Sequence, residues 1–90
     1  LSIDLLAART RSLNFHSCEL TAGYGTTALR ADGLVCVGTV FLRGGFRAAG
    51  EVRLLSAAIA GDLDCSGSTF ENPGNFALNA DGLECRGSVF

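Results

Sequence analysis

The sequence has no tryptophan or methionine, and its 90 residues include one proline, one tyrosine and one histidine. It also has no excess of positive charge, since seven basic and nine acidic residues give a formal net charge of −2. Non-specific binding to a nucleic acid needs a cationic patch that releases counterions. The longest apolar runs, residues 34–42 and 54–61, are far shorter than the ~20 residues that cross a bilayer. We therefore expect no direct nucleic-acid binding and no membrane span.

What the sequence does contain is apolar and glycine-rich: 48% of the residues are hydrophobic and twelve are glycine. A chain of this length forms one domain with a marginal core, so we predict a single folded unit over residues 1–90. The start shows neither the charged segment nor the cleavage pattern of a secretory leader, and we expect a cytoplasmic protein. The first residue is Leu rather than Met, which leaves open a processed form or a piece of a longer protein.

Two segments of eleven letters are nearly the same, ADGLVCVGTVF at 31–41 and ADGLECRGSVF at 80–90. They agree at eight positions, and the offset between them is 49. Inside them is a shorter pattern, L-x-C-x-G-x-x-F. It begins at Leu34, Leu63 and Leu83, and a degenerate copy begins at Leu13, so the successive intervals are 21, 29 and 20. Internal repeats of this length are typical of solenoid proteins.

The short pattern has a simple physical meaning. Residues two apart point to the same side of an extended strand, so Leu and Cys share one side. The Gly permits a sharp corner, and the small residue and Phe form a second short strand. Such strands are stable only when each coil pairs with the coils above and below it. We therefore predict an all-β, parallel β-solenoid of about four coils with roughly 20 residues each.

In this prediction residues 13–90 form the coils and residues 1–12 are a candidate N-terminal cap. A helix over 1–12 or over 54–60 is the alternative, because periodicity does not separate short apolar runs. The longest interval predicts an outward loop or an extra corner near residues 42–50, and DG and NPGN predict turns. Equivalent residues are expected to stack in three buried columns: Leu34, Leu63 and Leu83; Cys36, Cys65 and Cys85; and Phe41, Phe70 and Phe90.

Residues 50–90, GEVRLLSAAIAGDLDCSGSTFENPGNFALNADGLECRGSVF, resemble the repeating unit of bacterial proteins related to the pentapeptide-repeat proteins. The steps S-T-F and S-V-F are similar to the A-x-[LF] step of that superfamily, in which both residues point into a square β-helix. The resemblance covers most of the chain from residue 13 onward. It implies a right-handed solenoid, and it gives little about function, although some such relatives carry the label "oxidoreductase".

The cysteines are the first candidates for chemistry. We interpret Cys36, Cys65 and Cys85 as a column of small buried apolar residues, since free Cys is among the most buried residue types. Disulfides between neighbouring coils and metal binding are the alternatives. Cys18 lies outside the column and is expected to be a reduced thiol. There is no C-x-x-C pair, and His16 has no partner motif.

No other motif predicts an active site. Gly23 to Thr27, GYGTT, approaches a dinucleotide-binding loop, but residue 28 is Ala and no βαβ unit surrounds it, so we interpret it as a corner. Ser and Thr are frequent, but no base and orienting acid accompany them. We therefore predict no catalytic, cofactor-binding or metal-binding residues, no cofactor, and a protein that is not an enzyme.

The acidic residues Asp62, Asp64, Asp81 and Glu84 recur with the repeat, and we expect them outward on one side as a solvated face. The alternative is an acidic stripe. Some pentapeptide-repeat proteins imitate duplex DNA and occupy a topoisomerase, so a DNA-mimicking inhibitor of such an enzyme is the second functional hypothesis. The first is a non-enzymatic structural or protein-interaction repeat module with an unknown protein partner.

The last repeat ends at residue 90 with no capping segment behind it. Solenoid ends expose unpaired peptide groups and an apolar cross-section, and they normally need a cap. We expect Leu83, Cys85, Val89 and Phe90 to form an open end that associates with a second copy, most simply about a two-fold axis. A natural continuation of the chain is the alternative.

Overall fold

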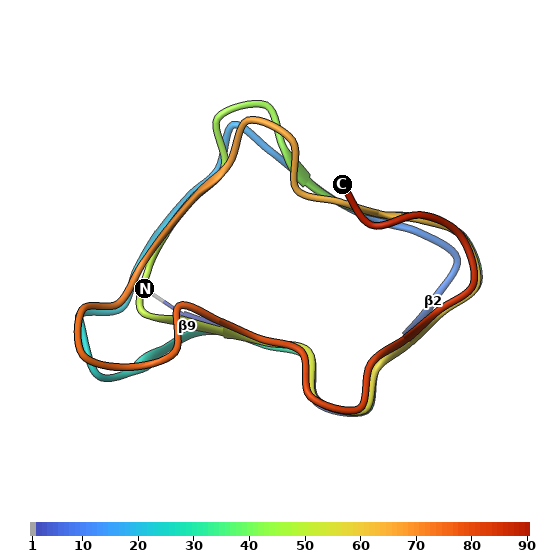
Figure 1. The fold of residues 1–90 in the computed structure, drawn as a ribbon, viewed down its shortest axis with the longest axis horizontal. Coiled ribbons are helices and arrows are strands. Elements are labelled where there is room, and N and C mark those ends of the chain that lie inside the picture. The colour runs from blue at the N-terminus through green and yellow to red at the C-terminus, as the bar shows by residue number, and fades with distance from the viewer. Residues whose placement is uncertain (1) are drawn as a thin grey trace.

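The computed structural model describes residues 2–90 and confirms the predicted fold class. Fourteen short strands and no helix occur in this range, and every strand pairing is parallel. Viewed along the stacking direction, the chain runs anticlockwise and its C-terminal coil lies nearest the viewer, so the solenoid is right-handed (Figure 1). No helix long and apolar enough to cross a membrane occurs in residues 2–90.

The strands form four parallel sheets, which are the four faces of the solenoid. The first face contains β1 (Ile3–Asp4), β5 (Thr27–Arg30), β9 (Glu51–Arg53) and β13 (Leu78–Asn79). The second face contains β2 (Arg9–Thr10), β6 (Val35–Cys36), β10 (Ala58–Ile59) and β14 (Glu84–Cys85). The third face contains β3 (Leu13–His16), β7 (Val40–Arg43) and β11 (Leu63–Asp64), and the fourth contains β4 (Glu19–Thr21), β8 (Arg47–Ala49) and β12 (Thr69–Glu71).

The coils are longer and fewer than the sequence predicted. On the first face Ile3 pairs with Leu29, Leu29 with Val52, and Val52 with Leu78, so the residue number rises by 26, 23 and 26 between successive coils. The chain therefore makes about three turns rather than the predicted four. We number its coils 1 to 4 from the N-terminus, and coil 4 is the partial turn over residues 78–90. One shorter and one longer coil together match the offset of the long repeat, which is thus a two-coil repeat.

The short pattern, in contrast, does not mark one coil. The copies at Leu34 and Leu83 begin beside β6 and β14 on the second face, whereas those at Leu13 and Leu63 begin on the third face, where both residues pair with Val40. The four copies thus alternate between two faces. The corner after the second face and the corner after the third face can both be formed by a short strand, a glycine turn and another short strand. The pattern therefore does not specify which of these two corners it forms.

The three predicted columns are wrong for this reason. Cys36 and Cys85 share a column, but both pair with Ile59 rather than with Cys65. The same register places Ala57 between Leu34 and Leu83, and the bridge from Leu63 to Val89 places Asp64 between Phe41 and Phe90. In each predicted column two of the three residues lie two coils apart with a different residue between them, and the third lies elsewhere.

The N-terminal residues form the first coil and not a helix. Ile3 and Asp4 pair with β5, and Arg9 and Thr10 pair with β6. Residues 54–60 contain a turn and β10, so the helical alternative is wrong there too. Between the first and second faces each coil turns through one residue with positive φ: Ala7, Gly33, Ser56 and Gly82, with φ between 54° and 72°. Gly33 and Gly82 are the glycines of the two DG dipeptides, which confirms the turns predicted there.

The hydrophobic core is concentrated in the middle of the stack. Phe46 is fully buried and lies between Phe15 and Phe70, with ring centroids 6.0 and 5.9 Å away. These three rings replace the predicted column of Phe41, Phe70 and Phe90. The remaining fully buried large side chains come from coils 2 and 3: Leu29, Leu34, Cys36, Val40, Leu42, Val52, Leu54, Ile59 and Leu63.

Candidate functional site

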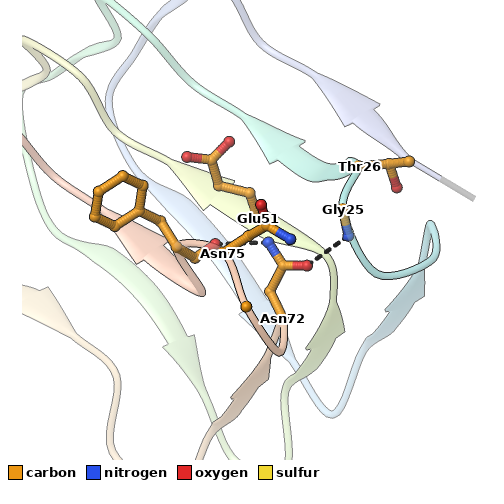
Figure 2. Close-up of a pocket in the computed structure, with 7 residues that line it drawn as sticks. Gly25, Thr26, Glu51, Asn72 and Asn75 are labelled. Atoms are coloured by element: carbon orange, nitrogen blue, oxygen red, sulfur yellow. Dashed lines mark hydrogen bonds between the residues drawn. The ribbon is translucent and has the colours of Figure 1, made fainter.

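A cleft lies between two loops that join the fourth face to the first. In coil 1 the loop spans residues 22–26 and in coil 3 it spans residues 72–77, whereas coil 2 passes from β8 to β9 through Gly50 alone. The two longer loops protrude together at the left of Figure 1, and the short turn of coil 2 stops before them. They leave a cleft of about 420 Å³, lined by Gly25, Thr26, Glu51, Asn72, Gly74, Asn75 and Phe76 (Figure 2).

Hydrogen bonds tie the two loops to each other across the short coil. The Gly25 N–H donates to Asn72 Oδ1 over 2.7 Å, and Asn72 Nδ2 donates to the Phe76 carbonyl over 2.8 Å (Figure 2). Tyr24 Oη donates to Glu71 Oε2 over 3.1 Å. This hydrogen bond and the negative charge of Glu71 raise the pKa of Tyr24. Asn72 is buried, so it acts as a fixed link between loops that are far apart in the sequence.

The cleft is mainly polar, with one aromatic ring at its rim. Glu51 lies behind it and already accepts hydrogen bonds from Asn79 Nδ2 at 3.2 Å and from Arg53 at 3.5 Å. Thr26 Oγ1 donates to the Gly23 carbonyl over 2.6 Å. Phe76 is 69% exposed and offers an apolar surface. These groups can hold a polar partner by hydrogen bonds, but they include no nucleophile beside a base.

The GYGTT segment lies in the coil 1 loop and is a corner, as predicted. Gly23 and Gly25 have φ of 104° and 82°, so the backbone of this turn requires glycine. The NPGN segment forms the coil 3 loop, closed by the Asn75 N–H donating to the Asn72 carbonyl over 3.0 Å. The outward loop or extra corner predicted near residues 42–50 is not found there: β7 and β8 are joined by three residues at the same corner where β3 and β4 are joined by two, and coil 2 is shorter than coils 1 and 3.

The four acidic residues do not form one outward side. Asp64 is nearly buried on the third face, where it accepts hydrogen bonds from the Ser66 N–H at 3.0 Å and from Arg43 at 3.1 Å. The bonds from Ser66, followed by the charge of Arg43, lower the pKa of Asp64. Asp62 accepts the Ser88 N–H at 2.9 Å at the corner before the third face. Asp81 lies at a different corner and Glu84 is in β14, so this expectation was wrong.

Arginines are interleaved with the acids on the first face. Arg53 is 3.1 Å from Asp32 and 3.5 Å from Glu51, and these contacts, with the Asp32 hydrogen bond foremost, raise the pKa of Arg53. Arg30 lies 3.8 Å from Asp32 and 4.0 Å from Asp4. This face therefore has charges of both signs rather than an acidic stripe.

All four cysteines are free thiols. Cys36 is 1% exposed, while Cys18, Cys65 and Cys85 are half-buried. Burial, with the nearby charge of Asp64, raises the pKa of Cys65. Within residues 2–90 no group of three His, Cys, Asp or Glu side chains is arranged to hold a metal ion.

His16 is the one residue with a hydroxyl neighbour that resembles a nucleophile and its base. Ser17 Oγ lies 3.1 Å from His16 Nδ1, but it donates its proton to the Gly44 carbonyl over 2.6 Å. Both side chains are exposed, and no acid among residues 2–90 is seen to hydrogen-bond the imidazole. The contact is therefore an interaction between neighbouring residues of a turn, in which the Ser17 hydroxyl proton is held by a backbone carbonyl.

The second surface feature is the outer edge of coil 4, which we call the C-terminal edge. Val89 and Phe90 are 63% and 62% exposed, and Leu78 is 38% exposed. Leu29 and Val40 occupy the equivalent positions in coil 2, two coils before Leu78 and Val89. Both lie under coil 3 and are fully buried, which shows the effect of a covering coil. Within residues 2–90 no further coil covers the C-terminal edge.

No family model matches this chain, and neither the curated proteins nor the solved structures contain a significant match to it.

Proposed function

We propose that this protein is a non-enzymatic structural and protein-interaction module that associates with itself through its C-terminal edge. The observation that carries the proposal is the contrast between Val89, 63% exposed, and Val40, fully buried under the next coil. Burying apolar surface is worth about 25 cal/mol per Å². An edge of strands with an apolar cross-section favours pairing with another edge of the same kind.

The rest of the molecule supports an interaction role. The stacked sheets and the loops tied through Asn72 give a rigid scaffold. The cleft beside Phe76 adds a second surface for polar contacts. The interleaved ion pairs of Arg30 and Arg53 do not favour the alternative, a DNA-mimicking topoisomerase inhibitor, because such mimicry needs a continuous acidic face.

Sedimentation velocity and light scattering over a range of concentrations test the proposal. The protein should show a mass above 9.3 kDa that rises with concentration. Val89→Asp should abolish the association, because it places a charge in the C-terminal edge.

Val37→Asp is the matched control, since Val37 is similarly exposed at 68% but lies on a side of the stack and not at its end. It should associate like the parent. A parent protein that stays monomeric at every concentration would contradict the proposal.

A further inference from the structure

The two-coil repeat means that the coils are of two alternating kinds. Residues 3–6, IDLL, match residues 52–55, VRLL, at the same offset as the long repeat, so coils 1 and 3 are one kind. Residues 31–41 and 80–90 make coils 2 and 4 the other kind. The left-handed turn follows the same alternation: it uses Ala7 and Ser56 in the odd coils and Gly33 and Gly82 in the even coils.

This alternation determines what fits each open end. The edge of coil 2 that faces the C-terminal end is covered by coil 3, an odd coil. The corresponding edge of coil 4 is the C-terminal edge, and coil 1 is an odd coil whose outer edge faces away from coil 2. We propose that coil 1 of a second copy stacks on the C-terminal edge, head to tail, in the register with which coil 3 stacks on coil 2. This inference rests on the proposed self-association.

The apolar residues match in this register. Leu29 pairs with Val52 inside the molecule, which places Leu78 opposite Ile3 of the second copy. Val40 pairs with Leu63, which places Val89 opposite Leu13 of the second copy. Ile3 and Leu13 are only partly buried, so both members of each pair have apolar surface left to cover.

The charges match at the centre of the second face. Val35 pairs with Ala58, and the two-coil equivalents of these residues are Glu84 and Arg9. Glu84 is thereby placed opposite Arg9 of the second copy. Both are exposed, and neither forms a salt bridge within residues 2–90. Opposite charges directly across two strands stabilise the pairing.

The hydrogen bonds between coils 2 and 3 also indicate which peptide groups would pair between two copies. The N–H groups of Ala31 and Gly33 each donate over 2.8 Å to carbonyls of coil 3. The equivalent groups of Ala80 and Gly82 face the C-terminal edge. The register gives them acceptors in the carbonyls of Asp4 and Leu6 of the second copy, since Arg53 and Leu55 are the acceptors inside the molecule.

The same register contains one unfavourable contact. Two residues beyond Glu84, Arg86 lies opposite Arg11 of the second copy. Its counterpart Val37 is 68% exposed, so side chains at this position point into solvent. Head-to-tail stacking along the solenoid axis does not close into a ring, and the assembly should therefore grow beyond a dimer. Coil 4 has no strand on the fourth face within residues 2–90, so stacking involves the other three faces.

Arg9 and Arg11 provide the test, because the same change to Glu should have opposite effects on association at these two positions. Arg9→Glu should weaken association roughly 2- to 30-fold, because it places like charges opposite each other. Arg11→Glu should strengthen association by a similar factor, because it gives Arg86 an opposite charge. Neither arginine forms a salt bridge within residues 2–90. Each variant is first checked by circular dichroism and melting temperature to have the parent's fold.

Glu84→Arg should weaken association as Arg9→Glu does, and the double variant R9E/E84R should restore it. A mixture of the two single variants should also associate, because each supplies the charge that the other lacks. Sedimentation velocity measures all of these at one salt concentration.

The competing arrangement, two C-terminal edges about a two-fold axis, brings neither Arg9 nor Arg11 to the interface. If both variants associate like the parent while Val89→Asp abolishes association, the head-to-tail inference is overturned and the proposed function stands. If both variants shift in the same direction, net charge and not register controls association, and the inference is again overturned. A parent that never associates overturns the proposed function itself.

Discussion

Removing the central ring of the aromatic stack, with Phe46→Ala, should cost more stability than any other single Phe→Ala change. Phe46 is fully buried, and its ring touches the rings of both Phe15 and Phe70. A buried Phe→Ala change costs about 3–5 kcal/mol. The value should lie toward the top of this range, because both ring contacts disappear and the stacked strands of a solenoid cannot close in to fill the space.

This loss is large for so small a domain. At about 0.05–0.15 kcal/mol per residue, the whole free energy of unfolding is about 5–13 kcal/mol. Phe70→Ala should cost about half as much, since Phe70 is only partly buried and has one ring contact. Phe76→Ala is the matched control: Phe76 is 69% exposed, and a surface change of this kind alters stability by roughly 0.5 kcal/mol or less.

Urea denaturation followed by circular dichroism, at protein concentrations too low for association, measures the three variants. The midpoint should fall most for Phe46→Ala, less for Phe70→Ala and hardly at all for Phe76→Ala, with similar slopes. If Phe46→Ala unfolds at the same urea concentration as Phe76→Ala, the ring of Phe46 is not in the core, and the corner between the third and fourth faces is packed differently.

Three further results are expected. Asp64→Asn should lower the free energy of unfolding at neutral pH and make it depend less on pH. The pKa of Asp64 is lowered in the folded state, so the stabilisation by this carboxylate is complete above its ordinary pKa near 3.8 and disappears as the pH falls through the lowered pKa. Melting curves recorded at several acidic pH values measure this difference. Asn72→Ala should cost about 1–3 kcal/mol and speed amide exchange at Gly25, because a buried link between the loops is lost. Iodoacetamide should modify Cys36 last of the four thiols because this side chain is buried, and it should modify Cys65 slowly because the pKa of this thiol is raised. Mass spectrometry of peptides measures the four rates. Rapid labelling of Cys36 would contradict its buried position.

The class of fold could be predicted because it depends on features that are local in sequence. Alternating apolar residues give short strands, and the DG glycines supply the left-handed turns that join them. The length of a coil is not local. It depends on which corner each L-x-C-x-G copy forms, and the copies at Leu34 and Leu63 form different corners. The interval between these two copies is therefore one coil plus a step to the next face.

The central aromatic residue was missed for a related reason. Phe46 lies in the corner that has one residue more than the corner of coil 1, outside every copy of the repeated pattern. Its partner Phe15 occupies the Cys position of the degenerate copy, and Phe70 ends the copy that begins at Leu63. The three rings meet because they turn inward from neighbouring positions in three coils, and no single spacing in the sequence connects them.

The cleft depends on a segment that coil 2 lacks, and so no motif in the sequence indicates it. The GYGTT and NPGN turns are visible as turns, but their separation of about two coils becomes meaningful only once the coil length is known. Coil 2 then has Gly50 where its neighbours have loops.

Gly50 has φ of 130°, and a Cβ built on it would lie 3.0 Å from the Thr26 carbonyl oxygen. Only glycine allows the coil 1 loop to pack so closely against this turn. Because lengthening a surface loop costs little, corners can vary while the faces stay in register. In this fold the sheets therefore fix the scaffold, and differences in corner length between successive coils create the cleft in its side.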